Sequence, residues 1–246
     1  MALTVRHERA AGEVAAMTME PWWRRPWIGP LLFVAVVFVA LSVPRYLTLD
    51  PSRSLVPQPA GSTIHYPLLV AHVIFASIAM VTCGFQVWPR FRRRHPVVHR
   101  IMGRVYVLGG VLPAGILGFI IGAISPFGPV IRVSNVLLAT LWLAVTIAGF
   151  RMARRRRFVE HRRWMIRSFA LTMSIITNRV WAVVWMIVLM PQLSTTFEGS
   201  EALMAQTIAG LAGWLGWVVP LVIAEWWLER DVIRRAPAPS KAALAP

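Results

Sequence analysis

The amino-acid sequence predicts an all-α membrane protein whose six transmembrane helices surround a central four-helix bundle. Composition points that way, because 57% of the 246 residues are hydrophobic and the mean hydropathy is +0.61, which is more apolar than a soluble protein with a polar surface. A helix needs about 20 mostly apolar residues to cross a bilayer. Six such stretches follow one another, at residues 27–43, 66–88, 101–124, 134–150, 165–190 and 206–228.

Arginine is concentrated between these apolar stretches, and its distribution predicts how the protein is oriented in the membrane. Lys and Arg number 26 against 10 Asp and Glu, a formal net charge of +16. Much of the excess lies in two basic stretches, at residues 89–100 and 151–163. Loops rich in Lys and Arg stay in the cytoplasm. We therefore expect a cytoplasmic N-terminal segment at residues 1–26, a six-helix transmembrane domain at residues 27–228 and a cytoplasmic, disordered tail rich in Ala and Pro at residues 229–246.

The charge and the motifs also bear on partners and chemistry. Basic groups beside apolar helices meet membrane lipids, and anionic headgroups at the cytoplasmic face are the expected partners. The sequence has no zinc-finger, helix-turn-helix or RNA-binding signature, which argues against nucleic acid. Its single cysteine, Cys83, has no internal disulfide partner. It also lacks zinc-site, paired-carboxylate and nucleophile-elbow motifs, so the sequence leaves open whether the protein is an enzyme.

A charged residue lies deep inside the fifth apolar stretch. Arg179 is about 20 Å from the cytoplasmic end of that stretch at a rise of 1.5 Å per residue, where an unpaired charge costs several kcal/mol. His72 is expected at the same depth, whereas Glu225 is expected near the cytoplasmic face. The level around Arg179 is expected to hold either a bound anion or polar ligand, or a structural, water-filled network. The candidate residues at this level and on the polar stripe of the second stretch are His72, Gln86, Asn135, Asn178 and Arg179.

Helical spacing places Arg179 on one face of the fifth stretch. Positions three or four residues apart share a face of a helix. Polar and small side chains face neighbouring helices because polar groups are costly in lipid. We therefore expect the aligned residues to face the inside of the bundle. They are His161, Met165, Ser168, Thr172, Ile175 and Arg179.

Two histidines open apolar stretches at the cytoplasmic side. His99 opens the third and His161 the fifth, so the N–H groups of both helix N-termini point at the arginine layer. Such a layer suits a phospholipid headgroup, a phosphate or the carboxylates of a porphyrin, or it is a solvated loop that only sets topology. Facing imidazoles can also ligate the iron of haem b, which makes His99 and His161 the metal ligands if haem is bound. The candidates in this layer are His99, Arg100, Arg104, Tyr106, His161, Arg162 and Arg167.

These motifs together resemble one known family. They are His72, Gly84-Phe-Gln86, His99-Arg-x-x-Gly103-Arg104-x-Tyr106, His161-Arg-x-Trp164-Met165-x-Arg167-Ser168 and Arg179. The combination resembles the bacterial predicted membrane proteins called domain of unknown function 2306, over residues 66–190. The resemblance implies a polytopic protein of the bacterial inner membrane with no established activity. Histidines at helix ends are also loosely similar to b-type cytochromes and ferric reductases, although these commonly carry two histidine pairs and the present chain supports at most one haem.

Three classes of function are compatible with these observations. The first is a membrane protein that binds a small anionic or lipid-like ligand in a bundle lined by His and Arg. The second is a b-type cytochrome or quinone-linked redox protein with haem between His99 and His161. The third is a transporter, for which the sequence shows neither paired broken helices nor an inverted repeat.

Overall fold

The computed structural model describes residues 28–59 and 61–235, and every regular element in these residues is a helix. Six spans in this part of the chain are long and apolar enough to cross a membrane, which confirms the all-α, six-helix prediction. The helices that build the spans are α2 (Ile28–Ser42), α4 (His65–Val87), α6 (Pro96–Arg104), η3 (Val105–Val111), α7 (Leu112–Ala123), α8 (Pro129–Arg154), α9 (Phe158–Thr172), α10 (Ser174–Leu189) and α11 (Glu201–Arg235). Shorter helices lie in the connections, namely α3 (Pro44–Leu47), η2 (Pro51–Arg53), α5 (Pro89–Arg94) and η4 (Met190–Gln192).

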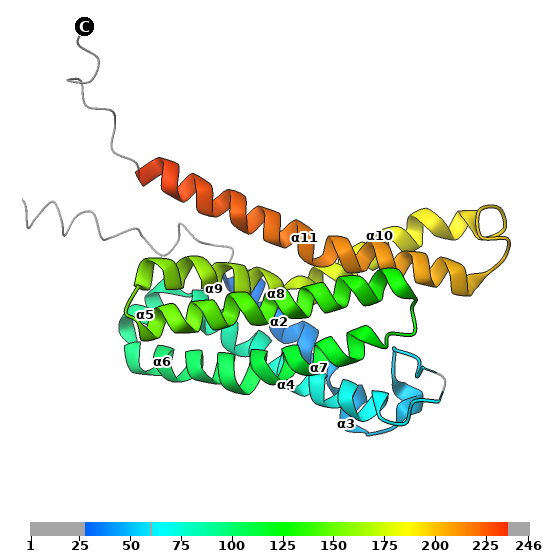
Figure 1. The fold of residues 1–246 in the computed structure, drawn as a ribbon, viewed down its shortest axis with the longest axis horizontal. Coiled ribbons are helices and arrows are strands. Elements are labelled where there is room, and N and C mark those ends of the chain that lie inside the picture. The colour runs from blue at the N-terminus through cyan, green and yellow to red at the C-terminus, as the bar shows by residue number, and fades with distance from the viewer. Residues whose placement is uncertain (1–27, 60, 236–246) are drawn as a thin grey trace, which may run out of the picture.

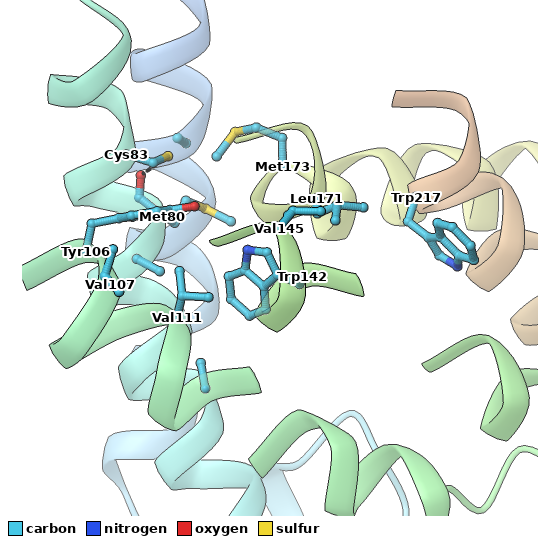
Figure 2. Packing of buried hydrophobic residues seen from close by; sticks show 13 residues of the cluster. Met80, Cys83, Tyr106, Val107, Val111, Trp142, Val145, Leu171, Met173 and Trp217 are labelled. Carbon is cyan, nitrogen blue, oxygen red and sulfur yellow. Dashed lines mark hydrogen bonds between the residues drawn. The ribbon is translucent and has the colours of Figure 1, made fainter. Parts of the chain in front are cut away.

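A four-helix bundle forms the centre of the molecule. Figure 1 shows α4, the continuous rod α6–η3–α7, α8 and α9 lying along one another, while α2 contacts α4, and α11 contacts α8 and α9. The buried cluster between these helices includes Met80, Cys83, Tyr106, Trp142 and Leu171 (Figure 2). The sequence-predicted core therefore exists, and it is filled by apolar side chains with hydroxyl groups among them.

A close backbone contact joins α4 to η3. A Cβ atom added at Gly110 would lie 2.9 Å from backbone atoms of Ala79, a distance that only a missing side chain permits. Gly109, next in the chain, faces open space apart from Val105 at 3.9 Å. The two neighbouring glycines therefore have different roles, and only Gly110 sets the distance between the helices.

The third and fifth spans are not uniform α-helices. The third has π-helical hydrogen bonding over Val105–Val111, just before Pro113, which has no N–H for the carbonyl four residues earlier. The fifth breaks at Met173, whose φ of −78° and ψ of −6° separate α9 from α10. Beyond this break, α10 leaves the bundle and runs beside α11 (Figure 1). A residue pattern that assumes one continuous fifth helix therefore fails past Met173.

The bundle has two chemically different ends. We call the end that holds α5 and the first turns of α6 and α9 the basic end, because the two arginine-rich stretches lie there. The loop end, opposite, holds α3 and the connections α7–α8 and α10–α11 (Figure 1).

The helical domain continues past the expected boundary at residue 228. α11 runs on to Arg235, so residues 229–235 are helical where the sequence analysis expected the tail to begin. Arg163 of α9 lies 3.9 Å from Glu229, the first residue of this extension. The expectations for residues 1–26 and for the tail from residue 236 onward fall outside the described residues.

Candidate functional site

His99 lies at the basic end with one ring nitrogen buried and unpaired. No described residue offers a hydrogen-bonding partner to its Nδ1 atom. Gln86 of α4 holds this turn of α6 in place, because its Nε2 donates to the carbonyl of His99 at 3.2 Å. Gly103, one turn further along, makes room for the same amide, since a Cβ there would lie 3.3 Å from Oε1 of Gln86. The structure therefore gives Gln86 a positioning role toward His99.

His161 faces the same region from α9. Its Nδ1 atom lies 2.8 Å from the carbonyl oxygen of Gly149 on α8, and a carbonyl can only accept, so Nδ1 carries the proton. The Nε2 atom of a neutral His161 is then a free acceptor. His99 and His161 both lie at the basic end, on α6 and α9. The structure thus places the predicted histidine pair at one end of the bundle.

The arginines of α9 are tied to α11. Arg167 makes a two-pronged ion pair with Glu225 at 2.5 and 2.7 Å, and its guanidinium also lies over the ring of Trp164 at 4.9 Å. Arg162 lies over Trp227 of α11 at 5.3 Å. Both arginines therefore hold α9 against α11 in addition to contributing positive charge.

The clamp to α11 was missed by the sequence analysis, although Glu225 was placed at the right end of the molecule. The signal was present, because Arg163 and Arg167 are four residues apart on α9 and Glu225 and Glu229 are four residues apart on α11. Matching spacings of opposite charge on two helices at the same depth indicate two parallel ion pairs. The structure shows both pairs.

Arg100 and Arg104 occupy the outside of α6. Both side chains are exposed, and in the described structure neither has an ion-pair partner. Arg100 directly follows His99 and Arg104 lies one turn further on, so two exposed charges without an ion-pair partner in the described structure lie on the helix that carries His99. They add to the positive potential of the basic end without fixing it to another helix.

Tyr106, also predicted as a site residue, belongs to a closed network of hydroxyl groups. Its hydroxyl lies 2.6 Å from that of Ser168 and 2.7 Å from that of Thr172. Trp142 donates to Thr172 at 3.0 Å, and the Thr146 hydroxyl lies 2.6 Å from that of Ser168. The Thr172 hydroxyl donates its proton to the carbonyl oxygen of Ser168, so it accepts the hydrogen bond from the Tyr106 hydroxyl. The Ser168 hydroxyl therefore donates to Tyr106 and accepts from Thr146. Every proton in the network has an acceptor, which suits a structural joint between η3, α8 and α9.

His72 and Asn135 both pack against α7 near the loop end. The Nδ1 atom of His72 lies 2.8 Å from the carbonyl oxygen of Ala114, and its ring lies 3.0 Å from where a Cβ of Gly118 would be. A Cβ atom added at Gly122, one turn after Gly118 on α7, would lie 2.7 Å from the Cβ of Asn135. The two residues thus lie at adjacent levels, as expected, and both seat their helices against α7.

Arg179 and Asn178 lie elsewhere. Asn178 packs on Gly216 of α11, where a Cβ would be 2.8 Å away, and the side chain of Arg179 is exposed on α10. The structure therefore does not bring Arg179 to His72. The break at Met173 is the physical reason, because it ends the buried face of α9 and α10 then turns toward α11 instead of α4.

Comparison with known proteins supports the family resemblance. A family model described as predicted membrane protein (DUF2306) matches residues 69–228, well over half of the chain. The match reaches the end of the sixth span, further than the 66–190 stretch expected from the motifs, and so it includes Glu225 as well as both histidines. No curated protein and no solved structure matches the chain.

Proposed function

The chain belongs to the DUF2306 family of predicted membrane proteins, and we propose that it binds a small anionic or lipid-like ligand at the basic end of its bundle. The observation that carries this proposal is the buried, unpaired Nδ1 atom of His99, on a helix whose exposed Arg100 and Arg104 have no ion-pair partner in the described structure. The proposal includes the location expected from the arginines, a bacterial inner membrane with both termini and the basic end in the cytoplasm.

A ligand with an acidic group would fit the hydrogen-bonding and charge properties of the basic end. A buried polar atom without a partner costs about 1–3 kcal/mol, so the Nδ1 atom of His99 favours a ligand that supplies an oxygen acceptor. Arg100 and Arg104 add positive charge that no described carboxylate neutralises. The phosphate of an anionic lipid headgroup combines both properties and occurs at the depth where these helices begin.

A test compares two histidines of the same basic stretch. The full chain is placed in bilayer discs of phosphatidylcholine with and without phosphatidylglycerol, and thermal unfolding is followed. We expect phosphatidylglycerol to stabilise the wild type, and His99→Ala to weaken the apparent lipid affinity by about tenfold, since a hydrogen bond to a charged group contributes about 1.5 kcal/mol or more. His95→Ala, which changes an exposed histidine four residues earlier, serves as the control and should respond like the wild type. Equal responses of His99→Ala and wild type would refute the proposal.

A second candidate is a b-type cytochrome, which one observation favours. A histidine that ligates a metal usually donates its other ring N–H to a carbonyl or carboxylate, and His161 makes such a bond to Gly149. His99 and His161 would then be the axial ligands of one haem. Absorption spectroscopy of the purified protein decides this case, because haem requires a Soret band that disappears in both His99→Ala and His161→Ala.

A further inference from the structure

The loop end carries a cluster of buried polar atoms that the proposed function does not use. Residues 44–59 and 61–64, which we call the cap, run from α2 to α4 and include α3 and η2. The cap packs through Tyr46 and Val56 onto Tyr66 of α4 and Ile121 of α7. This contact places the cap against the first turns of α4.

Three side-chain atoms beneath or within the cap have no hydrogen-bonding partner among the described residues. They are Nδ1 of His65, the hydroxyl of Tyr66 and Nε of Arg45. His65 is 2% exposed and Tyr66 is 5% exposed, so open solvent does not reach these atoms. Unpaired atoms of this kind in neighbouring residues of α4 and in the cap packed on that helix are unusual, because most buried polar groups in proteins are hydrogen-bonded.

The backbone at the same place also offers free donors. α4 begins at His65 and is 23 residues long, and Ile64 at its N-cap has no side chain that can cap the first turn. The N–H groups of His65 and Tyr66 are among the first-turn donors that an α-helix leaves unpaired. The helix N-terminus therefore adds positive potential to the side-chain donors.

No acid in the cap neutralises Arg45. The only carboxylate among residues 44–64 is Asp50, which accepts hydrogen bonds from the backbone N–H and the hydroxyl of Ser52 and lies 3.6 Å from Arg53. The bonds from Ser52 hold the pKa of Asp50 below its usual value, so this carboxylate stays ionised and faces Arg53. The positive charge of Arg45 therefore has no carboxylate partner within the cap.

We propose that this cluster binds an oxyanion, the carboxylate or phosphate group of a molecule that reaches the loop end. The Nε–H of Arg45 can only donate a hydrogen bond, and both Tyr66 and His65 can donate. An oxyanion can accept bonds from these donors and neutralise the arginine, whereas a water molecule would leave the charge of Arg45 without a counter-charge. The site is independent of the basic-end site, because it uses other residues at the opposite end of the bundle.

The first test uses inorganic phosphate as the probe. The full chain is placed in phosphatidylcholine discs, and phosphate is titrated by calorimetry into the wild type and into His99→Ala, which removes the basic-end site from the measurement. We expect saturable binding that survives in His99→Ala. Adding Tyr66→Phe should weaken it about tenfold through loss of one hydrogen bond to a charged group, and Arg45→Gln should weaken it at least as much. Tyr46→Phe, a buried tyrosine of the same cluster, is the matched control and should bind like its parent.

A second measurement separates a dissolved anion from a lipid headgroup and guards against misfolding. Thermal unfolding is recorded in discs with and without phosphatidylglycerol and with and without phosphate. Tyr66→Phe should unfold no earlier than the wild type when neither is present, because the change removes only an unpaired hydroxyl. Stabilisation that needs Tyr66 in phosphatidylglycerol alone would identify a headgroup, and stabilisation only with phosphate would identify a dissolved oxyanion. The proposal is overturned if neither addition produces stabilisation that depends on Tyr66 and Arg45.

Discussion

The fourth and fifth spans are similar in hydropathy, 1.9 and 1.7, yet the structure uses them differently. In the most apolar window of the fourth, 33% of the residues are buried inside the protein, against 11% in the fifth. α8 places Trp142 and Thr146 in the hydroxyl network of the core, whereas α10 presents Arg179 on an exposed surface. Similar apolar content therefore does not decide which helices form the core, since α8 and α9 supply the hydroxyl network and α10 does not. The following changes test that distinction.

The largest effect is expected where the backbones of α4 and η3 meet closely. Gly110→Ala forces a Cβ atom to within 2.9 Å of the backbone of Ala79 and should lower the free energy of unfolding by about 1–3 kcal/mol. Gly109→Ala enters open space and should be neutral or stabilising by about 0.5–1 kcal/mol, since alanine favours helix over glycine. Detergent-induced unfolding of the two variants in micelles measures the difference. Equal effects would mean that α4 and η3 do not meet closely.

The second-largest loss of stability is expected from a substitution in the hydroxyl network. Thr146→Val keeps the shape of a fully buried side chain and removes the donor to Ser168, so it should cost about 1–2 kcal/mol. Thr140→Val, on an exposed position of the same helix, should cost close to nothing. Measured unfolding free energies that do not differ would show that the network contributes nothing to the core.

The ion pair between α9 and α11 is expected to contribute less. Glu225 is 43% exposed in its side chain and Arg167 is 17% exposed, so solvent screens the attraction and we expect a coupling energy of about 1 kcal/mol. A double-mutant cycle with Arg167→Gln and Glu225→Gln measures this coupling. A coupling of zero would indicate that Arg167 is held by Trp164 alone.

The smallest effect is expected on α10. Arg179→Leu removes an exposed charge that has no ion-pair partner in the described structure, so no contact is lost and the free energy of unfolding should fall by no more than about 0.5 kcal/mol. Unfolding in micelles, with membrane insertion as the control, checks this. A large loss of stability would mean that Arg179 is paired inside the bundle, as a continuous fifth helix would require.

Much of the architecture could be predicted from the sequence because it depends on local composition. Apolar length located the six spans, and the arginine stretches with His99 and His161 located the basic end. The position of Arg179 could not be predicted, because the helix break at Met173 changes the direction of α10, which carries Arg179. Helical periodicity carries no information across such a break. The unpaired atoms of His65 and Tyr66 were also out of reach, because only the folded cap encloses them.

The distance between the His99 imidazole and a lipid phosphorus atom tests the central proposal most directly. Solid-state NMR on histidine-labelled protein in phosphatidylglycerol bilayers measures the ¹⁵N–³¹P dipolar coupling, and His99→Ala identifies the signal. If Nδ1 of His99 donates to a phosphate oxygen at an ordinary hydrogen-bond distance, nitrogen and phosphorus lie about 4 Å apart, and we predict strong dephasing that disappears in His99→Ala and persists in His95→Ala. Absence of dephasing at His99 would contradict binding of an anionic headgroup at the basic end.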